Sequence, residues 1–370
     1  MAEPYPVDEF VAQALLERDT HLAAIVRTLA KYGFPALLGF AGINRARQGS
    51  TNALTKLIGV SYLAHGGAEA PGAMTTRQTA LVATAQEMFR DASLVHDDLM
   101  DKSDTRRGRP SLHRHLEDLH RESDWLGDSA EMGVSLALMI GDAMLIMADT
   151  LIGKALGSLE APQATYMLDL HHSTRIEQVL GQAMDTIYPY LPDLEDPEEV
   201  IQQALATVQA KSARYMAGTP LALGAAAAGA DRGECDVMMQ VGVRLGEAFQ
   251  LRDDVQGAIG DAAAAGKPVG QDLIDGKRTV LIGLTMRLLP PSERRAFMGA
   301  LLRGNAPPVE ARVQHMQTVI RQSGAVDQVE AMIEGRRTQA FEILQTSSLD
   351  PVGQEAIRQM GDWLLTPARI

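Results

Sequence analysis

The chain has 370 residues, of which 46% are apolar and 22% are charged, and its formal net charge is −13 at pH 7. This composition supports a large apolar core and excludes an intrinsically disordered chain. The acidic balance disfavours non-specific nucleic-acid binding, which needs a basic surface, but it allows an anionic substrate whose contact a metal ion mediates. A single cysteine, Cys235, cannot form a disulfide within the chain, which indicates a reducing compartment. We therefore predict a cytoplasmic protein without a nucleic-acid partner.

Helical patterning runs through nearly the whole chain. The N-terminal segment MAEPYPVDEF is acidic and lacks the apolar run of a signal peptide. Apolar residues then recur at three- and four-residue spacing, as in EMFRDASLVHDDL at 87–99. The most apolar stretch, 134–153, carries Asp142 and Asp149, so we expect a buried helix there and no membrane span. Another helix is expected at 241–261.

Glycine- and proline-rich breaks separate these helices, but none is long enough for a flexible linker between domains. They fall at residues 65–72, 188–199, 228–235 and 304–308. Sustained two-residue alternation and internal repeats are both missing from the sequence. The pattern predicts one all-α domain over residues 1–370, with helices packed around an apolar core.

Two acidic clusters stand near the ends of predicted helices. Asp97 and Asp101 are four residues apart, so their carboxylates share one helix face about 6 Å apart at Cβ, with Asp98 beside them. Asp253 and Asp254 form the second cluster. Carboxylate oxygens in this arrangement suit Mg²⁺, which offsets their mutual repulsion and bridges to phosphate oxygens.

Basic residues follow each acidic cluster in a loop. Arg106 and Arg107 follow the first cluster, and Lys267 and Lys277 follow the second. Arginine binds phosphate oxygens through two parallel N–H groups of its planar guanidinium, and lysine binds them through its compact ammonium charge. The joint pattern predicts a metal-dependent site for a diphosphate.

The motifs carrying this pattern resemble those of the trans-isoprenyl diphosphate synthases. DDLMDKSDTRRGRPSLH resembles the first aspartate-rich motif of that family, and FQLRDDVQGAIGDAAAAGKPVGQDLIDGKRT resembles the second with its tail. GQAMD, KSARYMAG and MIGDAML resemble further family segments, and the likeness runs in the family's order from about residue 40 to 285. The resemblance implies a helical bundle around a deep central cavity, with the two motifs facing each other at its mouth, and a homodimer.

The resemblance also implies a reaction and the roles of individual residues. Three Mg²⁺ ions would assist transfer of an allylic group to isopentenyl diphosphate, two of them on Asp97 and Asp101 and the third on Asp253. Asp98 and Asp254 would complete the two motifs. The residues expected to hold the diphosphates or to line the path of the allylic cation are Arg47, Arg106, Arg107, Gln182, Lys211, Phe249, Gln250, Lys267 and Lys277.

Product length follows from the helix that precedes the first motif, along which the growing chain runs in this family's fold. Ala92 and Ser93 are small, so they do not block the chain at fifteen carbons. Phe89 lies one further turn away and could close the cavity. We therefore expect a product of twenty carbons, or of twenty-five, as in a geranylgeranyl diphosphate synthase.

The sequence departs from the family pattern at three places. Gly257 replaces the third aspartate of the second motif. In GINRARQ, Asn44 and Gln48 replace a lysine and a proline of the isopentenyl diphosphate site, while Arg90 replaces a residue that is usually histidine or glutamine. We interpret Arg90 as compensating for the lysine lost at Asn44; the alternative is that the isopentenyl diphosphate site no longer functions.

Two alternative functions remain open at this point. A class I terpene cyclase, or another transferase, would ionise one prenyl diphosphate without isopentenyl diphosphate. The aromatic content of only 4% and the missing cyclase metal motif argue against it. A non-catalytic regulatory subunit is the other alternative, and the intact first motif argues against that.

Overall fold

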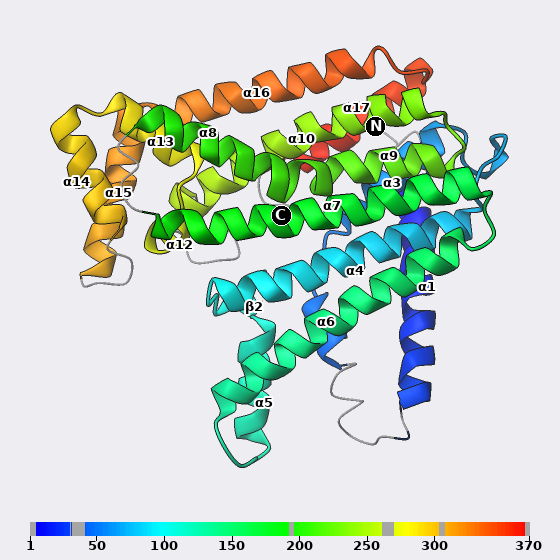
Figure 1. Ribbon diagram of the computed structural model, residues 1–370, viewed down its shortest axis with the longest axis horizontal. Coiled ribbons are helices and arrows are strands. Elements are labelled where there is room, and N and C mark those ends of the chain that lie inside the picture. The colour runs from blue at the N-terminus through cyan, green and yellow to red at the C-terminus, as the bar shows by residue number, and fades with distance from the viewer. Residues whose placement is uncertain are drawn as a thin grey trace. The chain divides into compact units, whose positions relative to one another are not determined.

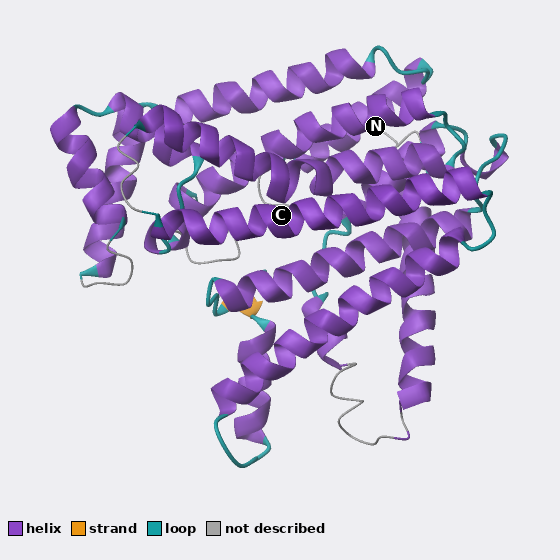
Figure 2. Ribbon diagram, viewed as in Figure 1, coloured by secondary structure: helices purple, strands orange, loops and turns teal. Residues whose placement is uncertain are grey.

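The computed structural model describes residues 5–29, 31, 41–191, 196–260, 270–302 and 308–366, and it is helical through most of them (Figure 1, Figure 2). Within these ranges the strands are the two-residue β1 (Thr105–Arg106) and β2 (Arg109–Pro110), which pair antiparallel. The predicted all-α fold class is therefore confirmed.

The chain divides into two compact units. The first unit comprises Met1–His171, Pro220–Cys235 and Leu349–Met360, and the second comprises His172–Thr219, Asp236–Ser348 and Gly361–Ile370. The single domain predicted over residues 1–370, and the predicted meeting of the two acidic motifs, stay predictions.

The first unit is organised around α4. Its described elements are α1 (Val7–Leu29), α3 (Ala53–Ala64), η2 (Gly67–Glu69), α4 (Thr76–Met100), β1, β2, α5 (Leu112–Glu122), α6 (Ser129–Leu156), the first part of α7 (Ala161–Ile187), and most of α9 (Thr219–Ala227) and α17 (Pro351–Leu364). Helix α4 packs against α1, α3 and α6, and α5 packs on α6. Figure 1 shows α4 and α6 running side by side.

Both ends of α4 are fixed by local sequence. Thr75 and Gln78 form a capping box at the start, in which each side chain pairs with the other residue's backbone N–H. At the other end Asp101 is the C-cap and Lys102 has a φ of +52°. The N–H of Ser103 donates to the carbonyl of Asp98 at 2.9 Å, which closes the last turn.

Helix α6 is, among the described residues, the one helix long and apolar enough to cross a membrane. It carries Asp142 and Asp149, and it packs against α4 and α5. Asp128 caps its first turn by accepting a hydrogen bond from the N–H of Glu131. In the most apolar window of this helix 44% of the residues are buried, so the helix predicted to be buried is buried only in part, and the predicted absence of a membrane span stays a prediction.

The second unit is built around α13, which is buried from Val280 to Met286. The unit contains the rest of α7, η3 (Tyr188–Tyr190), α8 (Pro197–Val208), the π-helix η4 (Gln209–Gly218), most of α10 (Arg232–Ile259), α12 (Gln271–Ile274), α13 (Val280–Leu288), α14 (Pro291–Leu301), α15 (Val309–Ser323) and α16 (Ala325–Leu344). Helix α13 packs against α8, α14, α15 and α16. Its continuous apolar run explains this central place.

Candidate active site

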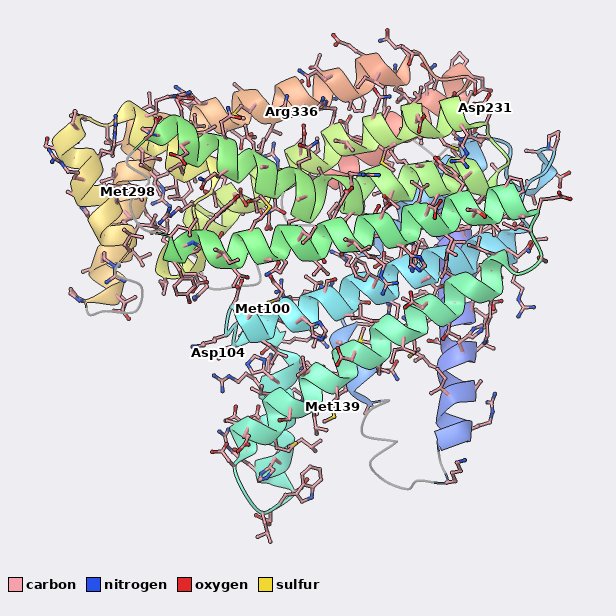
Figure 3. The ribbon with its side chains drawn as sticks, in the orientation of Figure 1. Met100, Asp104, Met139, Asp231, Met298 and Arg336 are labelled. Carbon is pink, nitrogen blue, oxygen red and sulfur yellow. The ribbon has the colours of Figure 1, made fainter. Side chains whose placement is uncertain are left out.

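The first acidic cluster lies at the C-terminal end of α4. Asp97 and Asp98 occupy its last turn, and Asp101 is the C-cap; Figure 3 marks this end of the helix by Met100 and the following turn by Asp104. The helix dipole is negative here, so three carboxylates are unfavourable for folding unless cations offset them. The position therefore indicates a cation-binding role.

Arg106 supplies part of this compensation. Its Nη2 donates to Asp97 at 2.9 Å and to Asp98 at 2.6 Å, and its Nε donates to Asp98 at 2.9 Å. Burial alone would lower the pKa of Arg106, but the charges of Asp98 and Asp97 outweigh it, so the pKa is raised. Arg106 thus stays charged and fixes the orientation of both carboxylates.

A tight hairpin places the next arginine. Arg107 and Gly108 connect β1 to β2 with φ values of +53° and +70°, as in the two-residue turns that match strand twist. The Nη2 of Arg107 lies 3.9 Å from the buried carboxylate of Asp91. Burial, followed by the charge of Arg90, lowers the pKa of Arg107 to about 10. An anion bound beside Arg107 would raise the pKa of its guanidinium again.

Asp91 belongs to a buried charge cluster, which we define as Arg47, Glu87, Arg90, Asp91 and Arg107. The Nη1 of Arg47 donates to Asp91 at 2.5 Å, and Arg90 lies 3.8 Å from Glu87. Glu87 also accepts from the backbone N–H of Thr55 at 3.1 Å. With three arginines and two acids, the cluster carries one excess positive charge.

This excess charge comes with unused hydrogen-bond donors. Nε of Arg47 and both Nη atoms of Arg107 are buried and donate no hydrogen bond among the described residues. Buried donors normally have partners, so the cluster is suited to an anionic ligand. Asp91 and Glu87 were not predicted from the sequence, although two acidic residues within the apolar run EMFRDASLV were a signal for them.

A pocket opens beside this cluster. Its polar lining consists of Arg45, Gln48, Asp91, Asp98, Arg106, Arg109 and Ser111. Gln48 accepts hydrogen bonds from Arg45 at 2.6 Å and from Arg109 at 2.7 Å. Gln48 replaces the family's proline, and it therefore holds two arginine side chains in place. Asn44, which was predicted to belong to the isopentenyl diphosphate site, immediately precedes Arg45 and is half-buried.

In the second unit, Gly181 of the GQAMD segment allows α7 to approach η4. A Cβ at Gly181 would lie 2.3 Å from the backbone nitrogen of Lys211, so only glycine fits. Four residues later, Asp185 accepts a hydrogen bond from Nζ of Lys211 at 2.6 Å, and Nζ of Lys277 lies 3.5 Å away. A π-helix such as η4 frequently marks a functional site.

The second acidic cluster lies on the face of α10 that packs against η4. Gly242 and Gly246 permit the close approach, since a Cβ at either would lie 2.3 Å from a carbonyl oxygen of η4. On the same face, Gln250 accepts from Ser212 at 2.5 Å and donates to Asp254 at 2.8 Å. Burial is the main cause that raises the pKa of Asp254. The negative charges of Asp272, Asp253 and Asp185 raise it further, whereas the hydrogen bond from Gln250 lowers it. This crowding of carboxylates also favours a bound cation.

The remaining predicted residues lie where the helical patterns placed them, except one. Phe89, Ala92, Gln182 and Phe249 are buried on their helices, and Ser93 is half-buried with Oγ donating to the carbonyl of Phe89 at 3.0 Å. Lys267 lies outside the described residues. The roles assigned to these residues stay predictions.

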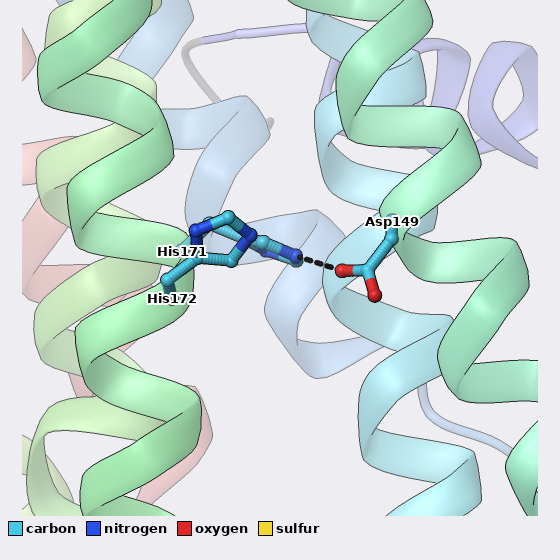
Figure 4. A group of neighbouring side chains, drawn as sticks. All are labelled: Asp149, His171 and His172. Atoms are coloured by element: carbon cyan, nitrogen blue, oxygen red, sulfur yellow. Dashed lines mark hydrogen bonds and ion pairs between the residues drawn. The ribbon is translucent and has the colours of Figure 1, made fainter.

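A separate polar group on α6 and α7 involves Asp149 and His171 (Figure 4). Nε2 of His171 lies 3.3 Å from Asp149, and Nδ1 lies 2.8 Å from Nε2 of Gln86. Because both ring nitrogens are hydrogen-bonded, this group is suited to a structural role more than to metal binding. His172 follows as the next residue of α7.

Comparison with known proteins agrees with this chemistry. A family model described as polyprenyl synthetase matches residues 46–319. A geranylgeranyl diphosphate synthase of Sulfolobus acidocaldarius is 27% identical over 282 residues, which cover 76% of this chain and 78% of that protein. A geranylfarnesyl diphosphate synthase of Aeropyrum pernix is 28% identical over 77% of this chain and 81% of its own.

A solved structure is also similar to this chain. It is the geranylgeranyl pyrophosphate synthase of Corynebacterium glutamicum complexed with isoprenyl diphosphate and magnesium, with a TM-score of 0.86 and 28% identity. The match covers 98% of this chain and 99% of that one. The chain belongs to the polyprenyl synthetase family. The predicted family and the predicted enzyme class, a trans-prenyltransferase, are confirmed.

Proposed function

We propose that this enzyme condenses an allylic diphosphate with isopentenyl diphosphate and releases a trans-prenyl diphosphate of twenty carbons, or of twenty-five. The observation that carries the proposal is the placement of Asp97, Asp98 and Asp101 at the C-terminal end of α4, beside a pocket lined by arginines. Carboxylates there suit a metal–diphosphate complex, and the arginines suit diphosphate oxygens. The synthases of similar sequence support this reaction.

The residues present fit Mg²⁺ as the cofactor. Asp97 and Asp101 offer hard oxygen ligands at i and i+4, and Asp253 offers another in the second unit. When bound, Mg²⁺ stabilises the negative charge that develops on the departing diphosphate. We propose three ions, as the resemblance implies.

The protein's own side chains then have distinct tasks. Arg106 orients Asp97 and Asp98, and stays charged while doing so. Arg47 and Arg107 bind diphosphate oxygens, which supply the acceptors that their buried donors lack among the described residues. Lys211 and Lys277, held by Asp185, bind diphosphate oxygens in the second unit. Fixed charges of this kind favour a transition state in which an allylic cation separates from diphosphate, because they need no reorganisation.

The test is a set of incubations of the purified enzyme. It receives Mg²⁺, isopentenyl diphosphate and one allylic diphosphate of five, ten or fifteen carbons, and mass spectrometry identifies the products. Elongation that stops when EDTA is added supports the proposal. A product formed without isopentenyl diphosphate would indicate the terpene cyclase alternative. Inactivity relieved only by a second protein would indicate a regulatory subunit.

Two substitutions on α4 should change product length in opposite directions. Ala92 and Phe89 are 0% and 3% exposed, and Phe89 lies eight residues before Asp97. Since one isoprene unit is about as long as one helical turn, Ala92→Phe should shorten the main product to about fifteen carbons, and Phe89→Ala should lengthen it beyond twenty. Chromatography of the dephosphorylated products measures both.

A matched control separates this effect from loss of stability. Phe297 on α14 is 2% exposed, so Phe297→Ala removes a buried ring of the same size in the second unit. We expect it to cost about 3–5 kcal/mol in stability, as Phe89→Ala does, without changing product length. Unchanged length in both α4 variants would show that this helix does not set the length.

We propose that the enzyme forms a homodimer through α6. Val134, Leu138 and Ile146 are exposed on α6 by 46%, 49% and 67%, and the exposed Asp142 lies between the last two, so this face of α6 is apolar except for one carboxylate. Light scattering should give twice the chain mass, and Ile146→Glu should reduce it. The cytoplasmic location, drawn from the single buried Cys235, stays a prediction.

A further inference from the structure

Two arginines that line the pocket beside α4 share one neutral acceptor. Oε1 of Gln48 accepts hydrogen bonds from Arg45 at 2.6 Å and from Arg109 at 2.7 Å, and both hydrogen bonds are exposed. Among the described residues, neither guanidinium has an acidic partner. Two positive charges therefore meet at one uncharged oxygen, which is unfavourable unless an anion joins them.

The acidic residues of the same pocket are paired with other arginines. Asp91 accepts a hydrogen bond from Arg47 at 2.5 Å, and Asp98 accepts one from Arg106 at 2.6 Å. These carboxylates do not balance the two guanidiniums that donate to Gln48. An anion that enters the pocket can balance them, because a guanidinium has further N–H donors to offer.

The residue at position 48 produces this arrangement. The backbone N–H of Gln48 donates to the carbonyl of Arg45 at 3.1 Å, which closes a turn. Proline, which the family pattern has at this position, lacks that N–H and has no side-chain acceptor. Gly49 follows with a φ of +78°, and a Cβ there would lie 3.3 Å from Cδ of Arg107, so the turn packs closely on the β1–β2 hairpin that carries Arg109.

We propose that Arg45 and Arg109 bind the diphosphate of isopentenyl diphosphate and that Gln48 is the residue that positions them. This inference rests on the proposed function. The pair supplies the positive charge that the family's lysine provides and that Asn44 lacks. Arg90, the other candidate for this compensation, is buried, whereas the contacts of the pair with Gln48 are exposed to an entering substrate.

The decisive variant is Gln48→Glu. Glutamate keeps the backbone N–H and the acceptor oxygen, but its carboxylate offsets the charge of the two arginines. The KM for isopentenyl diphosphate should rise about tenfold, because charge-assisted contacts with the diphosphate are weakened. The kcat and the KM for the allylic diphosphate should stay near wild type. A purely structural role of Gln48 predicts no rise in either KM, since a carboxylate holds both arginines at least as firmly.

Two substitutions of Arg109 and one control complete the test. Arg109→Gln should also raise the KM for isopentenyl diphosphate by about tenfold, and Arg109→Lys, which keeps the charge, should restore most of the loss. Gln328→Glu is the matched control, because Gln328 accepts a hydrogen bond from Arg287 at 2.7 Å on the exposed surface of the second unit. It changes the net charge by the same amount and should leave the kinetic constants unchanged.

Steady-state kinetics with each substrate varied in turn distinguishes the outcomes. An active wild type whose KM for isopentenyl diphosphate is unchanged in Gln48→Glu and Arg109→Gln overturns the inference alone. An equal rise in the KM of both substrates also overturns it, because the pair would then not be specific for isopentenyl diphosphate. A wild-type enzyme that forms no elongated product with isopentenyl diphosphate overturns the inference and the proposed function together.

Discussion

Replacement of Asp97 by alanine should lower kcat for prenyl transfer by about 10²-fold or more and leave the fold intact. Asp97 is half-buried at the end of α4, and it accepts one hydrogen bond from Arg106 at 2.9 Å. Loss of a group that stabilises developing charge commonly costs about 10²–10³ in kcat. Steady-state kinetics with saturating Mg²⁺ and both substrates measures the effect.

Stability should respond in the opposite way to activity. A carboxylate at a helix C-terminus is unfavourable, so its removal contributes about 0.3–1 kcal/mol to stability. Arg106 keeps its two hydrogen bonds to Asp98 in this variant. The melting temperature without metal should therefore stay the same or rise, which a purely structural role of Asp97 would not produce.

Asp104→Ala is the matched control for Asp97→Ala. Asp104 lies in the turn just after the motif, is largely exposed and pairs with Arg114 at 2.7 Å. An exposed ion pair contributes at most about 1 kcal/mol, so activity and stability should both stay near wild type. Equal losses of activity in the two variants would contradict the assignment of Asp97 to the metal site.

Sequence periodicity was sufficient for the elements that carry the first acidic cluster. The spacing of apolar residues predicted the helix over 87–99, and α4 spans Thr76–Met100. The i and i+4 positions of Asp97 and Asp101 follow directly, because a helix fixes them locally. Helical periodicity of this kind predicts which side chains are neighbours only over about one helical turn.

Contacts between residues distant in sequence could not be predicted in this way. The pairing of Arg47 with Asp91 spans 44 residues, and the contact of Gly257 with Asp272 crosses from α10 to α12. Such contacts depend on how the helices pack, which periodicity does not encode. The charged residues of EMFRDASLV indicated a partner, but only the fold identifies it as Arg47.

The buried charge cluster should be the most sensitive part of the first unit to a change of stability. Asp91→Ala leaves Arg47, Arg90 and Arg107 with Glu87 as the only acid of the cluster. Removing one partner from a buried ion pair typically costs about 3–5 kcal/mol, because the remaining charge stays buried. We expect a melting temperature several degrees lower than that of the wild type, measured by circular dichroism.

Asp118→Ala is the control for this variant, since Asp118 and its partner Arg121 are both more than half exposed. It should change the free energy of unfolding by at most about 1 kcal/mol. A melting temperature of Asp91→Ala equal to that of this control would show that Asp91 does not balance the arginines.

Binding of a diphosphate should restore part of the stability that Asp91→Ala removes. In the wild type the cluster holds one positive charge in excess, and in the variant it holds two. An anion bound beside Arg47 and Arg107 then replaces the lost carboxylate, and a ligand that binds only the folded state raises its stability. Isopentenyl diphosphate should therefore raise the melting temperature of Asp91→Ala more than that of the wild type. An equal or smaller rise would show that the diphosphate binds elsewhere, because only an anion bound beside Arg47 and Arg107 can replace the negative charge of the missing Asp91 carboxylate.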